Sequence, residues 1–249
     1  MKLLNVELEV NSRCNRKCSY CPVSIMPFPQ VPRLIQERVL SAFIERLKEI
    51  DFDGRISFHF YNEPLIHKDL EGIVRRVLRA VPKCRPVLFT NGDLLTQQRY
   101  DSLVDAGLQM IVITSHSGKS HPPRPKQIVQ FSHDLVLTNR GGKMEDLPRA
   151  TEWDFSQRCY APSEMLIVTI TGEVVLCYED ADRSHVMGNI CDQSIIEIWN
   201  SKNYSRVRAE LEAGNRKGAC EMCMHCTNRA HTTAGKSDRS EPFWDLICS

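Results

Sequence analysis

The chain has 249 residues, of which 42% are hydrophobic and 25% are charged, and its formal net charge is +1. This ordinary globular composition is enough for one large domain, or for a medium domain with a small one. The near-neutral charge indicates neither nucleic acid nor an anionic membrane as a partner. We also see no apolar run near the ~20 residues of a membrane span and no secretory signal, so we expect a cytoplasmic protein.

The predicted elements alternate between strands and helices over the first part of the chain. In order, we expect a strand at 3–10, a helix at 34–50, a strand at 55–61, a helix at 70–78, a strand at 86–90, a helix at 94–106, a strand at 108–114 and a fifth strand at 134–138. Such alternation is typical of βα units around a parallel sheet. Ligand sites in these sheets lie beyond the carboxyl ends of the strands. Polar loops follow the predicted strands at 61–64, 90–93, 115–118 and 139–142, and we expect them to meet on one face.

The second part of the chain has a different pattern. Residues 118–130, rich in Pro, Lys and His, suggest a mobile surface loop, and the pattern weakens near residue 147. We therefore predict two domains, residues 1–147 and 148–249. A hairpin is expected at 165–177 with its turn at Gly172, and Ser194 with Glu197 forms a capping box that opens a helix reaching Gly214.

Eleven cysteines are the unusual feature of the composition. A disulfide framework belongs to short secreted chains, which does not match this one. Thiolate groups in a reducing compartment indicate metal or iron–sulfur ligands instead. Eight of the cysteines fall into such groups: Cys14, Cys18 and Cys21; Cys159 and Cys177; and Cys220, Cys223 and Cys226.

The first group has the spacing C-x3-C-x2-C. Three thiolates hold three irons of a four-iron cube and leave the fourth iron open to another ligand. A closed zinc site needs a fourth protein ligand, and no His or Cys lies close by in the sequence. Tyr20, just before the third cysteine, is an aromatic residue suited to pack beside an adenine.

These residues resemble the signature of the radical S-adenosylmethionine (SAM) superfamily. The resemblance implies that SAM binds the open iron, and that reduction yields a 5′-deoxyadenosyl radical, which abstracts a substrate hydrogen atom. The family's Gly-Gly-Glu-Pro loop, which receives the SAM amino group, corresponds to residues 61–64, where Tyr and Asn replace the two glycines. The cofactor contacts that we expect are Tyr20, Asn62, Glu63, Pro64, Asn91 and Ser115.

The later cysteines provide a second four-thiolate site. A structural zinc is the alternative. The arrangement is similar to the shortened "twitch" form of the SPASM extension, which holds one auxiliary 4Fe–4S cluster. The last two ligands are either Cys220 and Cys223 or Cys223 and Cys226, and we favour the latter pair beside Cys159 and Cys177. The expected fold is thus an α/β partial (β/α) radical SAM barrel with a C-terminal twitch domain, and two 4Fe–4S clusters and SAM as cofactors.

Five stretches make the resemblance closer, and they extend over nearly the whole chain. They are 55–65 (RISFHFYNEPL), 90–93 (TNGD), 134–142 (DLVLTNRGG), 177–180 (CYED) and 187–190 (MGNI). They resemble the twitch-type radical SAM alcohol dehydrogenases of aminoglycoside biosynthesis. This implies that a secondary alcohol of an aminocyclitol or aminoglycoside intermediate is oxidised to a ketone.

The same resemblance implies roles for several residues. Arg140 would lie near the substrate hydroxyl, and Tyr61, Tyr178 and Glu179 would contact the substrate. The substrate radical must lose a proton to a positioned group and an electron to the auxiliary cluster. Arginine is normally too basic to accept a proton, so a role shared with water or Glu179 is expected. An external one-electron reductant of the flavodoxin or ferredoxin type would supply the first cluster.

Other activities compete with this interpretation. An epimerase would return a hydrogen atom to the opposite face of the carbon, with a thiol as donor, and Cys191 is the candidate for that catalytic role. A buried structural thiol is the plain alternative for Cys191. Peptide-modifying relatives often carry an N-terminal leader-binding domain, and a motif starting at Cys14 leaves no room for one here. A non-catalytic zinc protein would be colourless, whereas two clusters predict a brown protein.

Overall fold

The computed structural model describes residues 3–26, 31–144 and 156–235. Strands and helices alternate along the first two of these parts, and short helices dominate the last. The elements are β1 Asn5–Leu8, η1 Pro22–Ser24, α1 Glu37–Glu49, β2 Arg55–Ser57, η2 Pro64–Ile66, α2 Leu70–Ala80, β3 Arg85–Thr90, α3 Gln97–Asp105, β4 Met110–Ser115, β5 Gln127–Phe131, α4 Ala161–Glu164, β6 Met165–Val168, β7 Glu173–Val175, β8 Val186–Asn189, α5 Ile195–Trp199, α6 Lys202–Glu212, α7 Arg216–Ala219 and α8 Glu221–His225.

The strands of the described residues form one sheet in the order β5-β4-β3-β2-β1-β6-β7-β8. All pairs from β5 to β6 are parallel, whereas β7 and β8 are antiparallel to their neighbours. The first strand therefore lies in the middle, and β6 pairs directly with it. The C-terminal hairpin continues the same sheet, so the predicted α/β class is correct.

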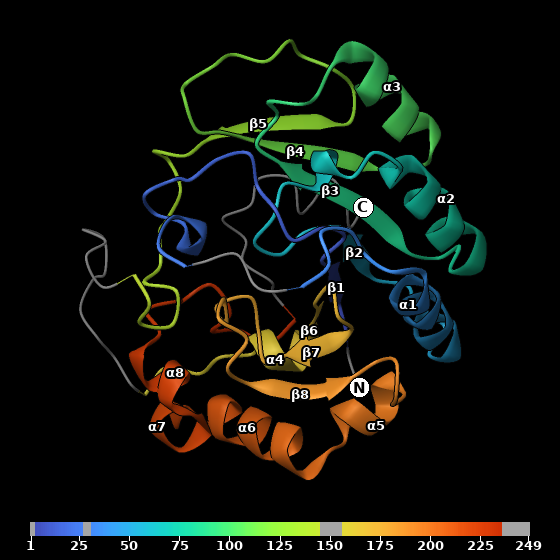
Figure 1. Ribbon diagram of the computed structural model, residues 1–249. Coiled ribbons are helices and arrows are strands. Elements are labelled where there is room, and N and C mark those ends of the chain that lie inside the picture. Colours follow the sequence, from blue (N-terminus) through green and yellow to red (C-terminus); the bar gives the residue numbers. More distant parts are fainter. Residues whose placement is uncertain (1–2, 27–30, 145–155, 236–249) are drawn as a thin grey trace.

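Helices cover one side of this sheet, as Figure 1 shows. In that view α1, α2 and α3 lie to the right of β1–β4, whereas the loop of residues 11–26 (blue) lies to the left. Helices α5 to α8 line the lower side, next to β8. The apolar residues of α1, Val39, Phe43 and Leu47, are buried in one hydrophobic core together with Val6 and Leu8 of β1.

The other side of β1 is polar although it is buried. Asn5, Glu7, Glu9 and Asn11 alternate with the apolar residues and are each at most 5% exposed. Because side chains of a strand alternate between its faces, these four groups point away from the helices. A polar inner face is expected where a partial barrel surrounds ligands instead of a dry core.

The position of the fifth strand was predicted wrongly. Strand β5 is Gln127–Phe131, which pairs with β4 in the register Ile111↔Gln127 to Ser115↔Phe131. It lies inside the segment predicted to be a mobile loop, and residues 134–138 form no strand, with Val136 82% exposed. Strand β5 lacks a strong apolar pattern because it is a half-exposed edge strand. Such strands tolerate polar residues like Gln127.

The long helix predicted to reach Gly214 is divided into α5 and α6. The capping box is confirmed, since the Ser194 hydroxyl accepts from the Glu197 N–H and the Glu197 carboxylate accepts in return. A second cap breaks the helix, because the Ser201 hydroxyl accepts a hydrogen bond from the Tyr204 N–H. The predicted domain boundary at 147/148 lies outside the described residues.

Candidate active site

The first cysteine group occupies the loop after β1. Cys14, Cys18 and Cys21 are partly buried free thiols, and the Arg16 N–H donates to Cys14 Sγ at 3.4 Å. Burial raises the pKa of Cys14 to about 11, and it also raises the pKa of Cys21. The other two thiols also contribute to the raised pKa of Cys14, so all three lie near one another. Their thiolate forms therefore need a compensating positive charge, which iron supplies.

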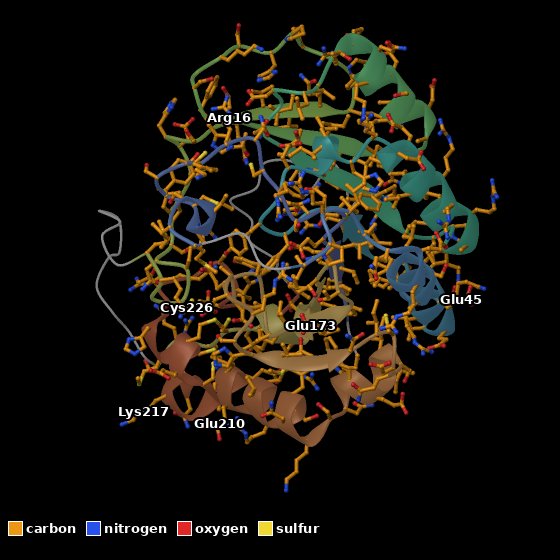
Figure 2. All side chains as sticks on the ribbon, viewed as in Figure 1. Arg16, Glu45, Glu173, Glu210, Lys217 and Cys226 are labelled. Atoms are coloured by element: carbon orange, nitrogen blue, oxygen red, sulfur yellow. The ribbon has the colours of Figure 1, made fainter. Side chains whose placement is uncertain are left out.

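A polar clamp attaches this loop to the loop after β3. Both carboxylate oxygens of Asp93 accept from the Arg16 guanidinium at 2.6 Å, and Asn15 Nδ2 donates to Asp93 at 2.9 Å. Asn91 Nδ2 donates to Asn15 Oδ1 at 2.8 Å and lies 3.9 Å from Cys14 Sγ. Figure 2 labels Arg16 on the cysteine loop, near the strands of the upper part of the sheet. The predicted cofactor residue Asn91 thus lies beside the first cysteine group.

Glu63 joins the loop after β2 to the end of β3. Its carboxylate, 2% exposed, accepts from Leu65 N at 2.9 Å, from Thr90 Oγ1 at 2.7 Å and from Asn91 N at 2.8 Å. Three donors from the protein already engage this carboxylate. Glu63 therefore holds the loop that was predicted to contact SAM against the end of β3.

Asn62 and Pro64 flank Glu63 in that loop. Pro64 begins η2, and Asn62 Oδ1 accepts from the Phe60 N–H at 2.7 Å. Asn62 Nδ2 is buried without a hydrogen-bond partner. Such a donor is costly unless a ligand satisfies it. This unpaired amide fits a loop that binds an oxygen- or nitrogen-bearing cofactor.

Tyr20 and Ser115 are the remaining predicted cofactor contacts, and both involve the end of β4. The Tyr20 hydroxyl hydrogen-bonds to His116 Nδ1, and the two rings stack with centroids 5.8 Å apart. The Ser115 hydroxyl donates to the Lys119 carbonyl at 2.8 Å. The structure thus attaches the aromatic residue of the cysteine loop to the end of β4, and it engages the Ser115 hydroxyl within its own loop.

Arg140 and Glu179 form the centre of a second group of polar residues. Arg140 Nη1 lies 3.5 Å from Glu179 Oε1, and the guanidinium lies 5.9 Å from the centre of the Tyr61 ring. The Tyr61 hydroxyl donates to the Tyr178 carbonyl at 2.7 Å. Arg140, Tyr61, Tyr178 and Glu179, all predicted from the sequence, are therefore brought together from distant segments.

The Arg140 backbone is unusual for a residue with a side chain. Its φ is +50°, and Gly141 and Gly142 follow with φ of +62° and +91°. A Cβ on Gly141 would lie 2.4 Å from Met222 Cγ, so only glycine fits there. A positive φ at arginine is strained and is held by its surroundings, which is common at functional sites.

The charge state of Arg140 follows from its neighbours. Burial by itself lowers the pKa of the guanidinium, but Tyr61 and Glu179 outweigh burial and raise the pKa above its ordinary value. Burial raises the pKa of Tyr61 well above that of a free phenol. Arg140 is therefore a permanent cation and hydrogen-bond donor, and Glu179 is the acceptor of the pair.

The second cysteine group adjoins Glu179. Burial raises the pKa of the Cys177 thiol, and Cys226, Glu179 and Cys159 raise it further. Burial also raises the pKa of Cys226 to about 12, with Glu179 and Cys159 contributing. The neighbouring Cys220, whose Sγ lies 3.1 Å away, and burial raise the pKa of Cys223, and Cys177 and Cys159 add to the rise. The cysteines of this group therefore influence one another; Figure 2 labels Cys226 beside the C-terminal helices.

Cys220 is placed differently from these four thiols. It caps α8, and its Sγ lies 3.1 Å from Cys223 Sγ. Cys220 and Cys226 thus lie at the two ends of α8, and the choice of Cys226 as a ligand stays a prediction.

Cys191 is also outside both cysteine groups. It follows β8, and its N–H donates to Asn189 Oδ1 at 2.9 Å. A Cβ on Gly172, in the turn between β6 and β7, would lie 3.0 Å from its Sγ. Among the hydrogen bonds of the described residues, none connects Cys191 to Arg140 or Glu179. The structure does not bring this thiol into the group around Arg140.

Two residues of this group were missed in the sequence. Thr138 Oγ1 donates to Glu179 at 2.9 Å and 3.0 Å, and Asn228 Nδ2 donates to Glu179 Oε1 at 2.7 Å and to the Tyr178 hydroxyl. The Asn228 N–H also donates to Cys226 Sγ at 3.4 Å. Thr138 lies two residues before Arg140, and Asn228 lies two residues after Cys226. This closeness to predicted site residues was the sequence signal that could have identified them. Asn228 is thus the link between a thiol and the Glu179 carboxylate.

The donor sets fit iron–sulfur clusters. Across residues 3–26, 31–144 and 156–235, no three His, Cys, Asp or Glu side chains are close enough to hold a single metal ion. A four-iron cube separates its thiolates more widely than one ion does, and its sulfurs accept main-chain N–H bonds like those at Cys14 and Cys226.

In the same described residues, no helix has the length and apolarity for a membrane span.

Family models match both parts of the chain. The radical SAM superfamily matches residues 8–137, and SPASM, described as an iron-sulfur cluster-binding domain, matches residues 159–227. The chain is 37% identical to the S-adenosyl-L-methionine-dependent 2-deoxy-scyllo-inosamine dehydrogenase of Niallia circulans, over 94% of this chain and 96% of the relative.

Solved structures agree with these matches. A crystal structure of BtrN in complex with AdoMet and 2-DOIA has a TM-score of 0.87 at 35% identity, covering 96% of this chain and 99% of that one. BtrN in an open conformation has a TM-score of 0.77 at 32% identity, covering 94% and 96%. The predicted fold is thereby confirmed. The chain belongs to the radical SAM superfamily and is a radical SAM dehydrogenase with a C-terminal SPASM-type iron–sulfur domain.

Proposed function

We propose that this enzyme oxidises a secondary alcohol of an aminocyclitol to a ketone, using two 4Fe–4S clusters and SAM. One observation carries the proposal: the Arg140–Glu179 pair adjoins both cysteine groups. Burial raises the pKa of Cys21 in the first group, and the Arg140 charge partly offsets this rise. In the second group, Asn228 donates both to Glu179 Oε1 at 2.7 Å and to Cys226 Sγ at 3.4 Å. Tyr61 interacts with Cys21 and with Cys177. A substrate held by the pair would be in reach of hydrogen abstraction on one side and electron removal on the other.

The cluster ligands that we propose are the two groups described above. Residues 1–147 would hold the first cluster and residues 148–249 the auxiliary cluster. The described thiols form no disulfide. The ligands are Cys14, Cys18 and Cys21 for the first cluster, and Cys159, Cys177, Cys223 and Cys226 for the auxiliary cluster.

Iron analysis tests this assignment. We expect about eight irons per chain in the wild type, and about four when Cys14, Cys18 and Cys21 are all changed to Ala. Cys226→Ala should lose the auxiliary cluster, whereas Cys220→Ala should keep about eight irons. The reverse result for Cys220 and Cys226 would show that the other pair of cysteines supplies the ligands.

The oxidation of the alcohol defines what the protein residues must do. Converting a secondary alcohol to a ketone removes a hydrogen atom from carbon, a proton from the hydroxyl group and one electron. When bound, the cofactors supply hydrogen-atom abstraction at the first cluster and one-electron acceptance at the auxiliary cluster. Arg140, a permanent cation, donates hydrogen bonds to the substrate oxygen and orients it. Because Arg140 keeps its protons, the hydroxyl proton passes to a Glu179 carboxylate oxygen.

Thr138 and Asn228 hold Glu179 in place for this role. Each donates a hydrogen bond to the carboxylate, which is 2% exposed. Tyr61 and Tyr178, which belong to the same hydrogen-bonded group, are the other proposed substrate contacts. Residues 61–64, with Asn91, are the proposed contacts of SAM, and Tyr20 is the proposed neighbour of its adenine. The relative's name identifies 2-deoxy-scyllo-inosamine as the substrate to test first.

Product analysis in heavy water tests the reaction. We expect a ketone from 2-deoxy-scyllo-inosamine, with one 5′-deoxyadenosine formed per ketone. Cys191→Ala should keep the wild-type rate within about threefold, because no acid–base or donor role is assigned to it. An inverted alcohol that carries solvent deuterium, and that Cys191→Ala no longer forms, would instead establish an epimerase.

We also propose a one-electron reductant of the flavodoxin or ferredoxin type, and a cytoplasmic location. The support for both is chemical. Reductive cleavage of SAM consumes an electron from outside the enzyme, and free, partly buried thiols such as those of the first group persist in a reducing compartment. Reduction of the purified enzyme by such a carrier, monitored by the loss of cluster absorbance, tests the first of these.

A further inference from the structure

Arg216 occupies a position between the segments that carry the auxiliary cysteines. It is the first residue of α7 and is only 3% exposed. Its guanidinium donates to three main-chain carbonyls: Nε to Gln157 at 3.0 Å, Nη1 to Cys226 at 3.1 Å and Nη2 to Asn228 at 3.0 Å. One side chain thus ties the segment that leads into Cys159 to the segment that contains Cys226.

The charge of Arg216 has no carboxylate partner. In the described part of the chain, no Asp or Glu forms an ion pair with it, and its hydrogen bonds all go to carbonyls. Burying a cation without a counter-charge is costly. Arg216 Nη1 donates to the main-chain carbonyl of Cys226 itself at 3.1 Å, so the buried guanidinium lies next to an auxiliary cysteine. The negative charge of a cluster held by these cysteines would balance the cation.

We infer that Arg216 is a positioning residue of the auxiliary cluster and raises its reduction potential. The inference rests on the proposed auxiliary cluster. A cube held by four thiolates is negatively charged, and its charge becomes more negative on reduction. A fixed cation nearby stabilises the reduced form more than the oxidised form. Arg216 thereby favours electron transfer from the substrate to the cluster, which completes the oxidation.

The test isolates the auxiliary cluster in the full-length chain. A parent variant with Cys14, Cys18 and Cys21 changed to Ala should retain about four irons, and its potential is measured by titration with EPR detection. Arg216→Gln removes the charge but keeps amide donors for the carbonyls, and Arg216→Met is a second neutral variant. Arg216→Lys keeps the charge.

We expect a neutral residue at Arg216 to lower the equilibrium constant for one-electron reduction at least tenfold, which corresponds to about 59 mV. Arg216→Lys should remain within threefold of the parent. Arg208 is the matched control: it is 9% exposed on α6, donates to the Trp199 carbonyl and has Tyr204 and Glu212 as electrostatic partners. Arg208→Gln should leave the potential within threefold of the parent.

The outcomes separate three cases. The inference is overturned if a folded neutral variant of Arg216 keeps the parent potential within threefold, or if Arg208→Gln lowers it as much. If Arg216→Gln does not retain iron, Arg216→Met provides the potential, and loss of iron in Arg216→Lys as well as in both neutral variants would overturn the role of the charge. A parent that holds no iron would contradict the proposed function itself.

Discussion

Arg140→Met should lower turnover about a hundredfold to a thousandfold while the enzyme keeps both clusters. This is the usual loss when one preorganised donor is removed from a reacting oxygen. The variant removes the guanidinium that lies 3.5 Å from Glu179 and 5.9 Å from the Tyr61 ring centre. The measurement is ketone formation per minute, alongside iron content and SAM binding.

The expected pattern distinguishes a role in the reaction from a role in folding. Iron content and SAM affinity should stay at wild-type values, because Arg140 is not among the proposed ligands. Arg140→Lys should recover only part of the rate, since an ammonium cannot reproduce the planar fork of donors. A rate within threefold of wild type for Arg140→Met would remove Arg140 from the proposed active site.

Arg183→Met should have the largest effect on stability, a decrease of about 3–5 kcal/mol in the free energy of unfolding. Arg183 resembles Arg140 in its left-handed backbone, with φ of +58°. Its Nη2 lies 2.9 Å from both carboxylate oxygens of Glu9, which is 2% exposed. Losing Arg183 would leave the Glu9 charge buried, with the Ile170 N–H at 2.8 Å as its remaining donor.

Urea unfolding under anaerobic conditions measures this effect. Glu9→Gln in the Arg183→Met background should restore part of the stability, because it removes the unpaired charge. Lys83→Met, which breaks the exposed ion pair of Lys83 with Asp51, should leave the unfolding midpoint unchanged. If Arg183→Met and Lys83→Met behave alike, the Glu9–Arg183 pair is not a determinant of stability.

The contrast between Arg140 and Arg183 shows what the sequence pattern could not separate. Both arginines have positive φ and both pair with a buried glutamate. A resemblance to known enzymes pointed to Arg140, whereas nothing in the local sequence pointed to Arg183. The difference lies in what surrounds each pair, since Glu179 adjoins the auxiliary cysteines and Glu9 adjoins β6.

The prediction of β5 failed for a related reason. Pairing between β4 and β5 joins Ile111 to Gln127, and an edge strand needs only one partner. The composition of residues 118–130 describes a solvated loop, but main-chain hydrogen bonds to β4 determine the strand. Residues 134–138, where the apolar pattern placed the fifth strand, form no strand.

By itself, the sequence determined the chemistry of the cysteines, the βα alternation and the capping box of Ser194. These features depend on residue type and short spacing, which local sequence encodes directly. Only the tertiary structure decided that Thr138 and Asn228 hold Glu179, and that Arg216 joins the segment before Cys159 to the segment of Cys226. Those relations join segments far apart in the chain, and burial within a common core brings them into contact.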